Sequence, residues 1–242
     1  MKAKLFSLLL FMNVMSFAQT AINKTTAVLP GQKINLDFDY PQLIQLSTWD
    51  KDEISITGTV SINEGDNDDA FRLETTSLGS EISVSGKMKD MEKLPHRITI
   101  KRDGRKIIFK TKADYAKYAD QNGHDYNSMS WGTDIEIFIA IKVPHNRETK
   151  VLSVYGTIEI KDFNAPLIAE STYGGVDVAL NEKSVGGLKA IAHYGQIFTN
   201  LDHHFNKGVF EDFHTVISAE LGSGPKYSLE SKYGNVYLRK AL

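Results

Sequence analysis

Two carboxylates, Glu159 and Asp177, lie 18 residues apart at equivalent positions of a repeated segment. If neighbouring copies lie side by side, these groups are separated by one strand spacing, about 5 Å, which is the separation of the nucleophile and the acid in retaining glycosidases. Two other copies carry Phe198 and Tyr237 at this position, and outward acidic residues are ordinarily solvated. The repeat therefore favours a plain surface over a catalytic pair, and we assign no catalytic residue.

Histidines raise the hypothesis of a metal site at "LDHHF", residues 201–205, with His193 and His214 elsewhere in the chain. Neighbouring residues on a strand point to opposite faces, so His203 and His204 could share an ion only in a loop. We interpret the segment as a turn between strands and predict no metal site.

The acidic segment "INEGDNDDAF", residues 62–71, contains Asp66, Asp68 and Asp69, whose oxygens suit a hard cation such as calcium. The rest of a calcium-binding motif is missing, so a solvated loop is the better interpretation. The chain has no Gly-x-Ser-x-Gly elbow, phosphate-binding loop, dinucleotide glycine pattern or cysteine pair. We therefore expect no cofactor and a non-enzymatic protein.

Aromatic side chains gather in "ADYAKYADQNGHDYNSMSWG", residues 113–132, which has no strand period. Tyrosine and tryptophan supply contact area at low entropic cost, which makes this segment a candidate binding loop. Its candidate binding residues are Tyr115, Tyr118, Tyr126 and Trp131. Alternatively, these rings fold back and cap the open end of the domain. A helix of one or two turns at most is expected within it, at 114–120.

The first part of the domain, residues 24–144, alternates apolar and polar residues with a period of two, which predicts half-buried strands. Turn residues and charges, such as Pro30-Gly31 and "WDKDE" (49–53), mark where strands end. The segment "DIEIFIAIKVP" (134–144) is apolar on both faces, so we expect a central strand there. Because no capped amphipathic helix is found, the protein is predicted to be all-β.

A hairpin is predicted within "RITIKRDGRKIIFKTK", residues 97–112. Asp103-Gly104 supplies the two positive φ angles of a two-residue type I′ turn. A turn at this point places Ile100 opposite Ile107 on one face, together with the next apolar pair, which supports the register.

The dipeptide Tyr-Gly occurs four times in the second part, residues 145–240, each time with an aliphatic residue three positions beyond the tyrosine. The copies are Tyr155-Gly156, Tyr173-Gly174, Tyr194-Gly195 and Tyr233-Gly234. The tyrosines are separated by 18, 21 and 39 residues, and the last gap is nearly two repeats. A fifth, decayed copy is predicted at Phe213-His214, unless "VISAELGSG" (216–224) is a strand outside the repeat.

Small or apolar residues lie four and two positions before each tyrosine, so they share its parity in a strand. After the glycine the apolar parity changes, which predicts a corner between two short strands. Gly174 at such a corner is expected to tolerate no β-branched replacement, because the backbone would be strained. The tyrosines are predicted to be structural residues that point inward and stack about 4.8 Å apart.

Repeats of about twenty residues, each with a strand, a corner and a strand, predict the rungs of a β-solenoid in which every rung stacks on the last. The alternative is an antiparallel sandwich in which the tyrosines recur by coincidence. The predicted fold is thus a single all-β domain with an N-terminal β region and hairpin followed by the Tyr-Gly rungs, over residues 19–242.

The amino-terminal segment has Lys2 and Lys4 before a short apolar run that ends in a small-x-small pattern. We predict a signal peptide over residues 1–18, and hence export. Without those two lysines, 26 of the 28 basic residues remain against 30 acidic ones, which gives no electrostatic reason to expect nucleic acid. No later apolar run is long enough for a membrane span, and the chain has no cysteine for a disulfide or a lipid anchor.

Three segments resemble a large bacterial family of putative adhesin domains, which are β-solenoid repeat proteins of the cell envelope. They are "LSTWDKDEISITG" (46–58), "IAIKVP" (139–144) and "LESKYGNVYLRK" (229–240). The resemblance spans roughly residues 44–238, although many members carry Asn-Gly-Asp or Ser-Gly-Asp where this chain has Tyr-Gly. It implies a location in the periplasm or at the cell surface and brings no catalytic residues.

The sequence therefore predicts an exported, non-catalytic envelope protein that is a binding or structural module. Its partner would be a glycan or a protein of the envelope or of a surface. The alternative is a polysaccharide-acting enzyme, a glycoside hydrolase or lyase, built on a β-helix scaffold.

Overall fold

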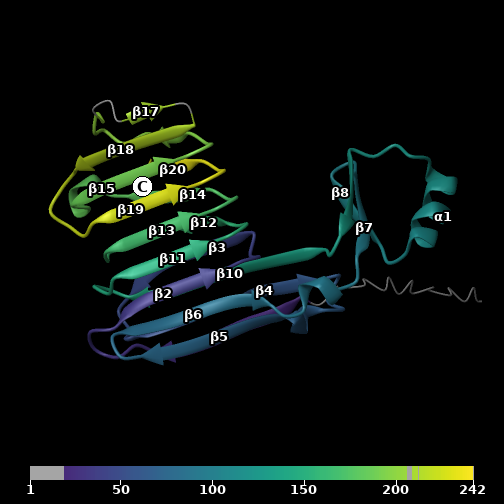
Figure 1. Ribbon diagram of the computed structural model, residues 1–242, viewed down its shortest axis with the longest axis horizontal. Coiled ribbons are helices and arrows are strands. Elements are labelled where there is room, and N and C mark those ends of the chain that lie inside the picture. The colour runs from purple at the N-terminus through teal and green to yellow at the C-terminus, as the bar shows by residue number, and fades with distance from the viewer. Residues whose placement is uncertain (1–18, 206–208, 212, 242) are drawn as a thin grey trace, which may run out of the picture.

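The structure is a computed structural model that describes residues 19–205, 209–211 and 213–241. The predicted signal peptide, residues 1–18, lies outside the described residues. Strands dominate, as Figure 1 shows, and they form two large mixed sheets and one small sheet. The prediction of an all-β protein is confirmed at this level.

The first large sheet, called sheet A, contains eight strands. In spatial order they are β1 (Thr20–Ala27), β4 (Glu53–Ile62), β10 (Ile135–Pro144), β3 (Leu43–Trp49), β12 (Thr157–Ile160), β14 (Val176–Leu180), β20 (Val236–Lys240) and β16 (Ile197–Thr199). The pairings from β10 to β16 are all parallel, and those of β4 with β1 and β10 are antiparallel. As predicted, β10 is a central strand.

The second large sheet, called sheet B, contains nine strands. In spatial order they are β17 (Val209–Glu211), β18 (His214–Glu220), β15 (Gly187–Ala192), β19 (Tyr227–Ser231), β13 (Leu167–Ser171), β11 (Thr149–Ser153), β2 (Lys33–Phe38), β6 (Glu81–Met88) and β5 (Phe71–Leu78). The strands from β15 to β6 pair in parallel, and antiparallel pairs flank them at both ends. This parallel arrangement excludes the antiparallel sandwich.

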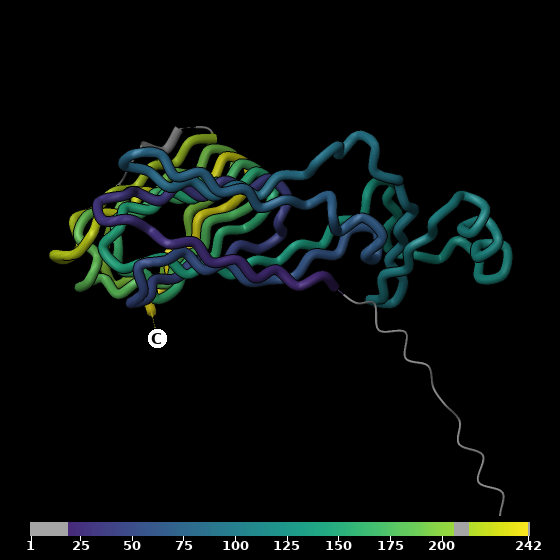
Figure 2. The backbone as a smooth tube through the Cα atoms, turned by 90° about the horizontal axis from the view of Figure 1, so that it is seen from below, coloured from purple at the N-terminus to yellow at the C-terminus, as the bar shows by residue number. Residues whose placement is uncertain are grey.

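Five segments each run along sheet B, turn a corner and return along sheet A. We call them units, and they are β2–β3, β11–β12, β13–β14, β19–β20 and β15–β16, in spatial order. Figure 2 looks along the stack from below, so the units lie behind one another. The β2–β3 unit was not recognised in the sequence, because Pro41 follows Tyr40 where the other copies have glycine.

The units are not stacked in chain order, which corrects the prediction that each rung stacks on the last. The unit β19–β20, the last in the chain, lies between β13–β14 and β15–β16. In sheet B, Leu229 faces Ala169 on one side and Ala190 on the other. The predicted fifth copy at Phe213-His214 also differs, because β18 is antiparallel to β15 and lies outside the parallel stack.

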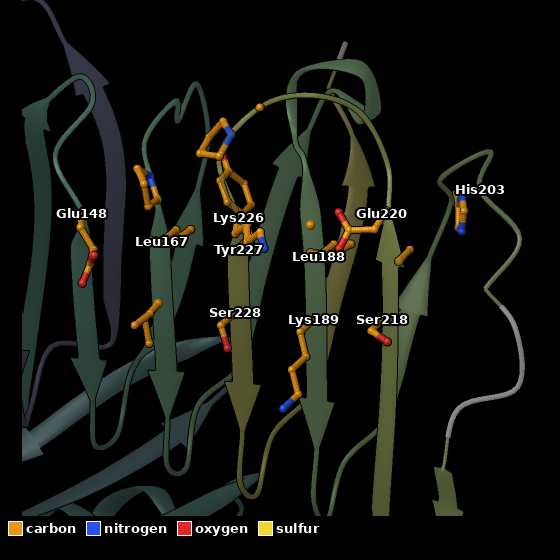
Figure 3. A pocket seen from close by; sticks show the side chains of 16 residues that line it. Glu148, Leu167, Leu188, Lys189, His203, Ser218, Glu220, Lys226, Tyr227 and Ser228 are labelled. Carbon is orange, nitrogen blue, oxygen red and sulfur yellow. The ribbon is translucent and has the colours of Figure 1, made fainter.

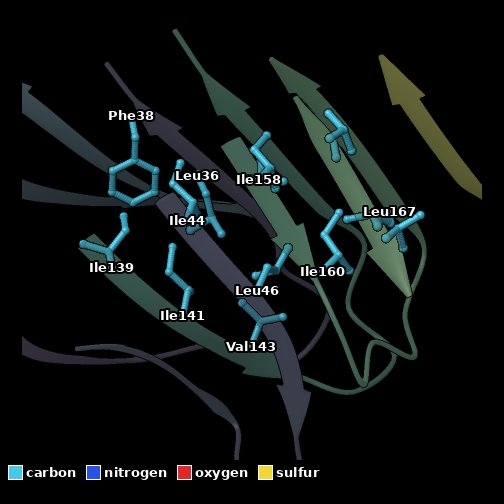
Figure 4. Packing of buried hydrophobic residues seen from close by; sticks show 14 of the residues in the cluster. Leu36, Phe38, Ile44, Leu46, Ile139, Ile141, Val143, Ile158, Ile160 and Leu167 are labelled. Carbon is cyan, nitrogen blue, oxygen red and sulfur yellow. The ribbon is translucent and has the colours of Figure 1, made fainter. Parts of the chain in front are cut away.

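The core lies between the two sheets, and the predicted inward columns supply much of it (Figure 4). Residues four and two positions before each repeat tyrosine are buried, as are those three and five positions after it in the first, second and fourth copies. They are Val151, Ser153, Ile158, Ile160, Ala169, Ser171, Val176, Val178, Ala190, Ala192, Leu229, Ser231, Val236 and Leu238. In the third copy, at the edge of sheet A, Ile197 is only half-buried and Thr199 is exposed.

The third sheet consists of β8 (Arg105–Phe109), β7 (Arg97–Arg102) and β9 (Ser128–Gly132). The predicted hairpin is confirmed, because Ile100 pairs with Ile107 and both Asp103 and Gly104 have positive φ, 51° and 73°. Helix α1 (Lys112–Asn122) is longer than expected. A capping box explains its start, with reciprocal hydrogen bonds between Thr111 and Asp114.

Candidate binding surface

A row of aromatic rings follows the corners where the units pass from sheet B to sheet A and ends at Phe213, which lies between β17 and β18. We call this row the aromatic ladder. Adjacent rings have centroids 5.5, 5.3, 5.2, 5.0 and 5.6 Å apart. In spatial order the rings are Tyr40, Tyr155, Tyr173, Tyr233, Tyr194 and Phe213. The predicted stacking of the tyrosines is confirmed, and their order is that of the strands in space.

The ladder faces solvent, so the prediction that the tyrosines point inward is wrong. Tyr155, Tyr173, Tyr194 and Tyr233 are 55, 55, 59 and 46 % exposed. The alternation of inward and outward side chains does not extend to these tyrosines, because each sheet B strand ends two residues before its tyrosine. For example, β11 ends at Ser153. The three residues that follow form the bend and turn the ring outward.

Serine hydroxyls hold these bends from inside. The buried Ser153 hydroxyl accepts from the Gly156 amide at 3.0 Å and donates to the Gly156 carbonyl at 2.9 Å. Ser171, from the next unit, donates to the same carbonyl at 3.0 Å. Ser231 accepts from the Gly234 amide at 3.0 Å and donates to the Gly174 carbonyl at 2.8 Å, so it joins two units.

Replacing Ser231 by alanine is expected to lower the free energy of unfolding by about 2 kcal/mol, because an amide and a carbonyl lose a partner in a buried place. Urea unfolding followed by circular dichroism measures this change. The matched control is Ser228→Ala, the same substitution on the outward side of β19, which should cost less than about 0.5 kcal/mol. Equal effects of the two substitutions would contradict the role of the Ser231 hydroxyl.

The tyrosine rings cover one another's faces, which decides what the ladder offers to a ligand. The planes of Tyr173 and Tyr155 differ by 10°, and those of Tyr173 and Tyr233 by 11°. A ligand therefore meets ring edges and hydroxyl groups, repeated at about the strand spacing. At one end of the tyrosine row, burial raises the pKa of Tyr40, with smaller contributions from Tyr155 and Asp39.

A second aromatic pair lies on β16 and β20, on the outward face of sheet A. The rings of Phe198 and Tyr237 stack with centroids 5.3 Å apart. The guanidinium carbon of Arg239 lies 5.1 Å from the centre of the Tyr237 ring. Arg239 also donates three hydrogen bonds to the Asp177 carboxylate, at 2.8 and 3.0 Å to one oxygen and at 2.7 Å to the other. Sequence parity predicted that Asp177, Phe198 and Tyr237 point outward, but not that the two rings stack.

Glu159 lies opposite Asp177 in adjacent parallel strands, as the sequence predicted. Hydrogen bonds from Lys161 and then from Gln45 hold the pKa of Glu159 below its ordinary value. The acid of a glycosidase needs the opposite shift, because it must be protonated at neutral pH. Since Asp177 is also paired with a cation, Arg239, this pair has the character of a surface ion-pair network.

The predicted binding segment, residues 113–132, is folded. Tyr115, Tyr118 and Tyr126 pack against a small core around Phe109. The third sheet and helix α1 together form what we call the small unit. It projects beyond the ends of β4 and β10, so it does not lie over the edge strands of the stack (Figure 1). The structure therefore does not support the alternative in which these rings fold back and cap the open end of the domain.

Trp131 differs from those three tyrosines because its side chain is 52 % exposed. Lys112 Nζ lies 5.0 Å from its ring centre, and His96 meets it edge-on. Of the four residues proposed for binding in this segment, Trp131 presents the most surface to a partner.

A hollow of about 1040 Å³ lies over sheet B, and sequence reasoning missed it (Figure 3). The loop 221–226 crosses the start of β15 there, since β18 and β19 lie on either side of that strand. The lining has charges of both signs, including Lys189 and Glu220. Burial raises the pKa of Tyr227 to about 12, and its hydroxyl donates to a main-chain carbonyl. This phenol is therefore a structural group of the hollow's wall.

The segment 201–205 is irregular, as predicted, and Glu182 accepts hydrogen bonds from the main-chain amides of Asp202 and His203. Within the described residues, no three histidine or acidic side chains are grouped so as to hold a metal ion. In the acidic segment, Asp66 pairs with Arg97 and Lys110. These ion pairs hold its pKa below the ordinary value.

No protein-family model matches the chain. No curated protein matches it either. One similar solved structure is described as a putative cell adhesion protein from Clostridium sporogenes ATCC 15579, 9 % identical, with a TM-score of 0.49 over 93 % of this chain and 100 % of that one. Another is described as a putative adhesin from Bacteroides fragilis NCTC 9343, 13 % identical, with a TM-score of 0.24 over 93 % of this chain and 98 % of that one.

Proposed function

We propose that the protein is an exported, non-catalytic β-solenoid of the cell envelope that attaches to a surface partner through its aromatic ladder. The observation that carries this proposal is the row of four tyrosine side chains that are 46 to 59 % exposed. Contiguous exposed aromatic surface is unfavourable in water and is typical of interaction sites. Tyrosine is also among the residues that interfaces favour, because it combines apolar area with a hydroxyl group.

The stacking of the units supports the solenoid interpretation. Ile158 faces Val176 in sheet A, and Val151 faces Ala169 in sheet B, so the same two units keep register on both sides of the corner. Such stacking aligns equivalent residues of every unit in straight columns. A repeated surface of this kind suits a ligand that is itself repetitive, such as a glycan chain, or a protein strand.

Export is supported by the lysines and the short apolar run at the amino terminus, residues 1–18. None of the described helices is long and apolar enough to cross a membrane. The exposure of the ladder supports a binding role, because its tyrosine rings and hydroxyl groups lie at the surface, where they can contact a partner.

The proposal is tested by replacing Tyr155, Tyr173 and Tyr233 together with phenylalanine. This change keeps the stack and removes three outward hydroxyl groups. Since a hydrogen bond contributes about 0.5–1.5 kcal/mol, attachment should fall about tenfold or more while the melting temperature stays within a few degrees. The measurements are binding of the labelled protein to a glycan array and to immobilised matrix proteins, together with thermal unfolding.

Two comparisons make this experiment decisive. The variant Trp131→Ser alters the exposed aromatic residue of the small unit and should leave attachment unchanged. If Trp131→Ser abolishes attachment and the triple variant keeps it, the binding surface lies on the small unit and the ladder is structural. If the parent protein attaches to neither panel, the adhesive role is contradicted.

A further inference from the structure

Two histidines meet beside the end of the aromatic ladder. His193 lies between β15 and Tyr194, and His214 opens β18 directly after Phe213. Their Nδ1 atoms are 3.2 Å apart. The ring centres are 4.8 Å apart, only 1.6 Å more than the Nδ1 atoms, which is less than a collinear arrangement of two rings would add. This separation fits an arrangement in which both Nδ1 atoms face a common point at the side of the rings.

Glu230 decides which nitrogen of His193 carries the proton. Its Oε1 lies 2.9 Å from His193 Nε2. A carboxylate only accepts, so in the neutral imidazole Nε2 donates and Nδ1 keeps its lone pair. An imidazole whose second nitrogen donates to a carboxylate is the arrangement that metal-ligating histidines regularly adopt.

We propose that His193 and His214 bind a divalent transition-metal ion through their Nδ1 atoms, with Glu230 as a positioning residue. Two nitrogens 3.2 Å apart, each at the 2.0–2.1 Å of a zinc–nitrogen bond, subtend about 103° at the ion, close to the tetrahedral angle. Without the ion, the Nδ1–H of His214 donates to the Nδ1 of His193. On binding, the His214 proton moves to Nε2 by exchange with solvent.

The two imidazole ligands determine which metal ions the site can bind. Imidazole nitrogens suit Cu²⁺, Ni²⁺ and Zn²⁺, whereas Mg²⁺ and Ca²⁺ prefer oxygen ligands. No third histidine or acidic ligand joins the pair within the described residues, so water completes the coordination. The His193 side chain is 34 % exposed, which leaves room for that water.

The bound ion would join two strands whose directions differ. His193 follows β15 of the parallel stack, and His214 belongs to β18, which pairs with it in the antiparallel direction. The ion therefore fastens the flanking strand to the stack at the end of the ladder, next to Tyr194 and Phe213. A ligand that binds only the folded state raises the melting temperature.

The test is calorimetric titration of the tag-free protein with Zn²⁺, Ni²⁺ and Cu²⁺, with Mg²⁺ as the control ion. We expect binding of the three transition metals, strongest for Cu²⁺, and none of Mg²⁺. His193→Gln and His214→Gln should each abolish it. Glu230→Gln should keep the ligands and weaken affinity about 10- to 100-fold. Histidine side-chain NMR signals should broaden with Cu²⁺ at these two residues first.

The control variant is the double substitution His203→Gln and His204→Gln, which removes two histidines of the segment 201–205 and should bind like the parent. All variants are checked by circular dichroism, and if His214→Gln is unfolded, His193→Gln and the NMR titration of the parent decide. The proposal is overturned if His193→Gln binds as tightly as the parent, if the His203 and His204 double variant loses the metal, or if the parent binds none of the three ions.

Discussion

A chain that ends after Lys226 is expected to lose the folded state of β15, β16 and β18, although all three precede the cut. The missing segment, β19–β20, lies inside the parallel stack, between β13–β14 and β15–β16. It buries Leu229, Val236 and Leu238 completely. At about 1.5–3 kcal/mol for each side chain, their loss removes roughly 5–9 kcal/mol, comparable to the whole stability of a typical domain.

Hydrogen exchange measures this effect strand by strand. In the truncated chain, the amides of β15 and β16 should exchange freely, because both strands lose their parallel partner. Removal of residues 241–242 is the control and should change stability by less than about 1 kcal/mol, since Ala241 is exposed and donates one main-chain hydrogen bond, to Leu180. Protected amides in β15 of the truncated chain would mean that it can pair directly with β13.

Gly174→Val is expected to cost about 3 kcal/mol or more, or to prevent folding, at the upper end of overpacking effects. A Cβ at Gly174 would overlap the carbonyl group of Gly156 and lie 2.8 Å from the amide nitrogen of Thr157. These atoms belong to the backbone of the neighbouring unit, so no side chain can rotate away. The cause differs from the backbone strain predicted at this corner, because Gly174 does not have a positive φ.

Gly132→Val is the matched control for this substitution. Gly132 lies in β9 and has no positive φ, and among the described residues no atom outside its chain neighbours lies within 4 Å of the place that a Cβ would take. Valine is favoured in strands, so the free energy of unfolding should change by less than about 1 kcal/mol. Denaturant unfolding compares the two variants, and a Gly174→Val protein as stable as Gly132→Val would contradict the close approach of the units.

Local patterns in the sequence predicted the strands, the inward columns and the hairpin correctly, because burial on one side of a strand imposes a period of two. The direction of the tyrosines could not be obtained in this way. Parity holds only while the strand continues, and the bend begins after Ser153. Helix α1 was underestimated because its cap pairs Thr111 with Asp114, where the usual capping box has glutamate or glutamine.

The spatial order of the units was beyond sequence reasoning for a different reason. Each unit presents the same kinds of residue to both neighbours, so Ala169 could face Ala190 as readily as it faces Leu229. The contacts within the candidate site could not be predicted from the sequence for the same reason. Tyr194 and Phe213 could be named, but their contact with each other, and that of His193 with His214, follows from the strand order.

The displaced position of β19–β20 also sets the order in which the chain can fold. The contact of Leu167 with Tyr227 joins residues 60 apart, and that of Leu188 with Tyr227 joins residues 39 apart. Contacts of such sequence separation slow folding, because a long loop must close before they form. Until β19 arrives, β15 can pair transiently with β13 with equivalent residues aligned, although the chain ending after Lys226 is not expected to keep this pairing. Folding must therefore include either a delay of β15 or the rupture of a premature pairing, and a slow phase that vanishes in the chain ending after Lys226 would reveal this competition.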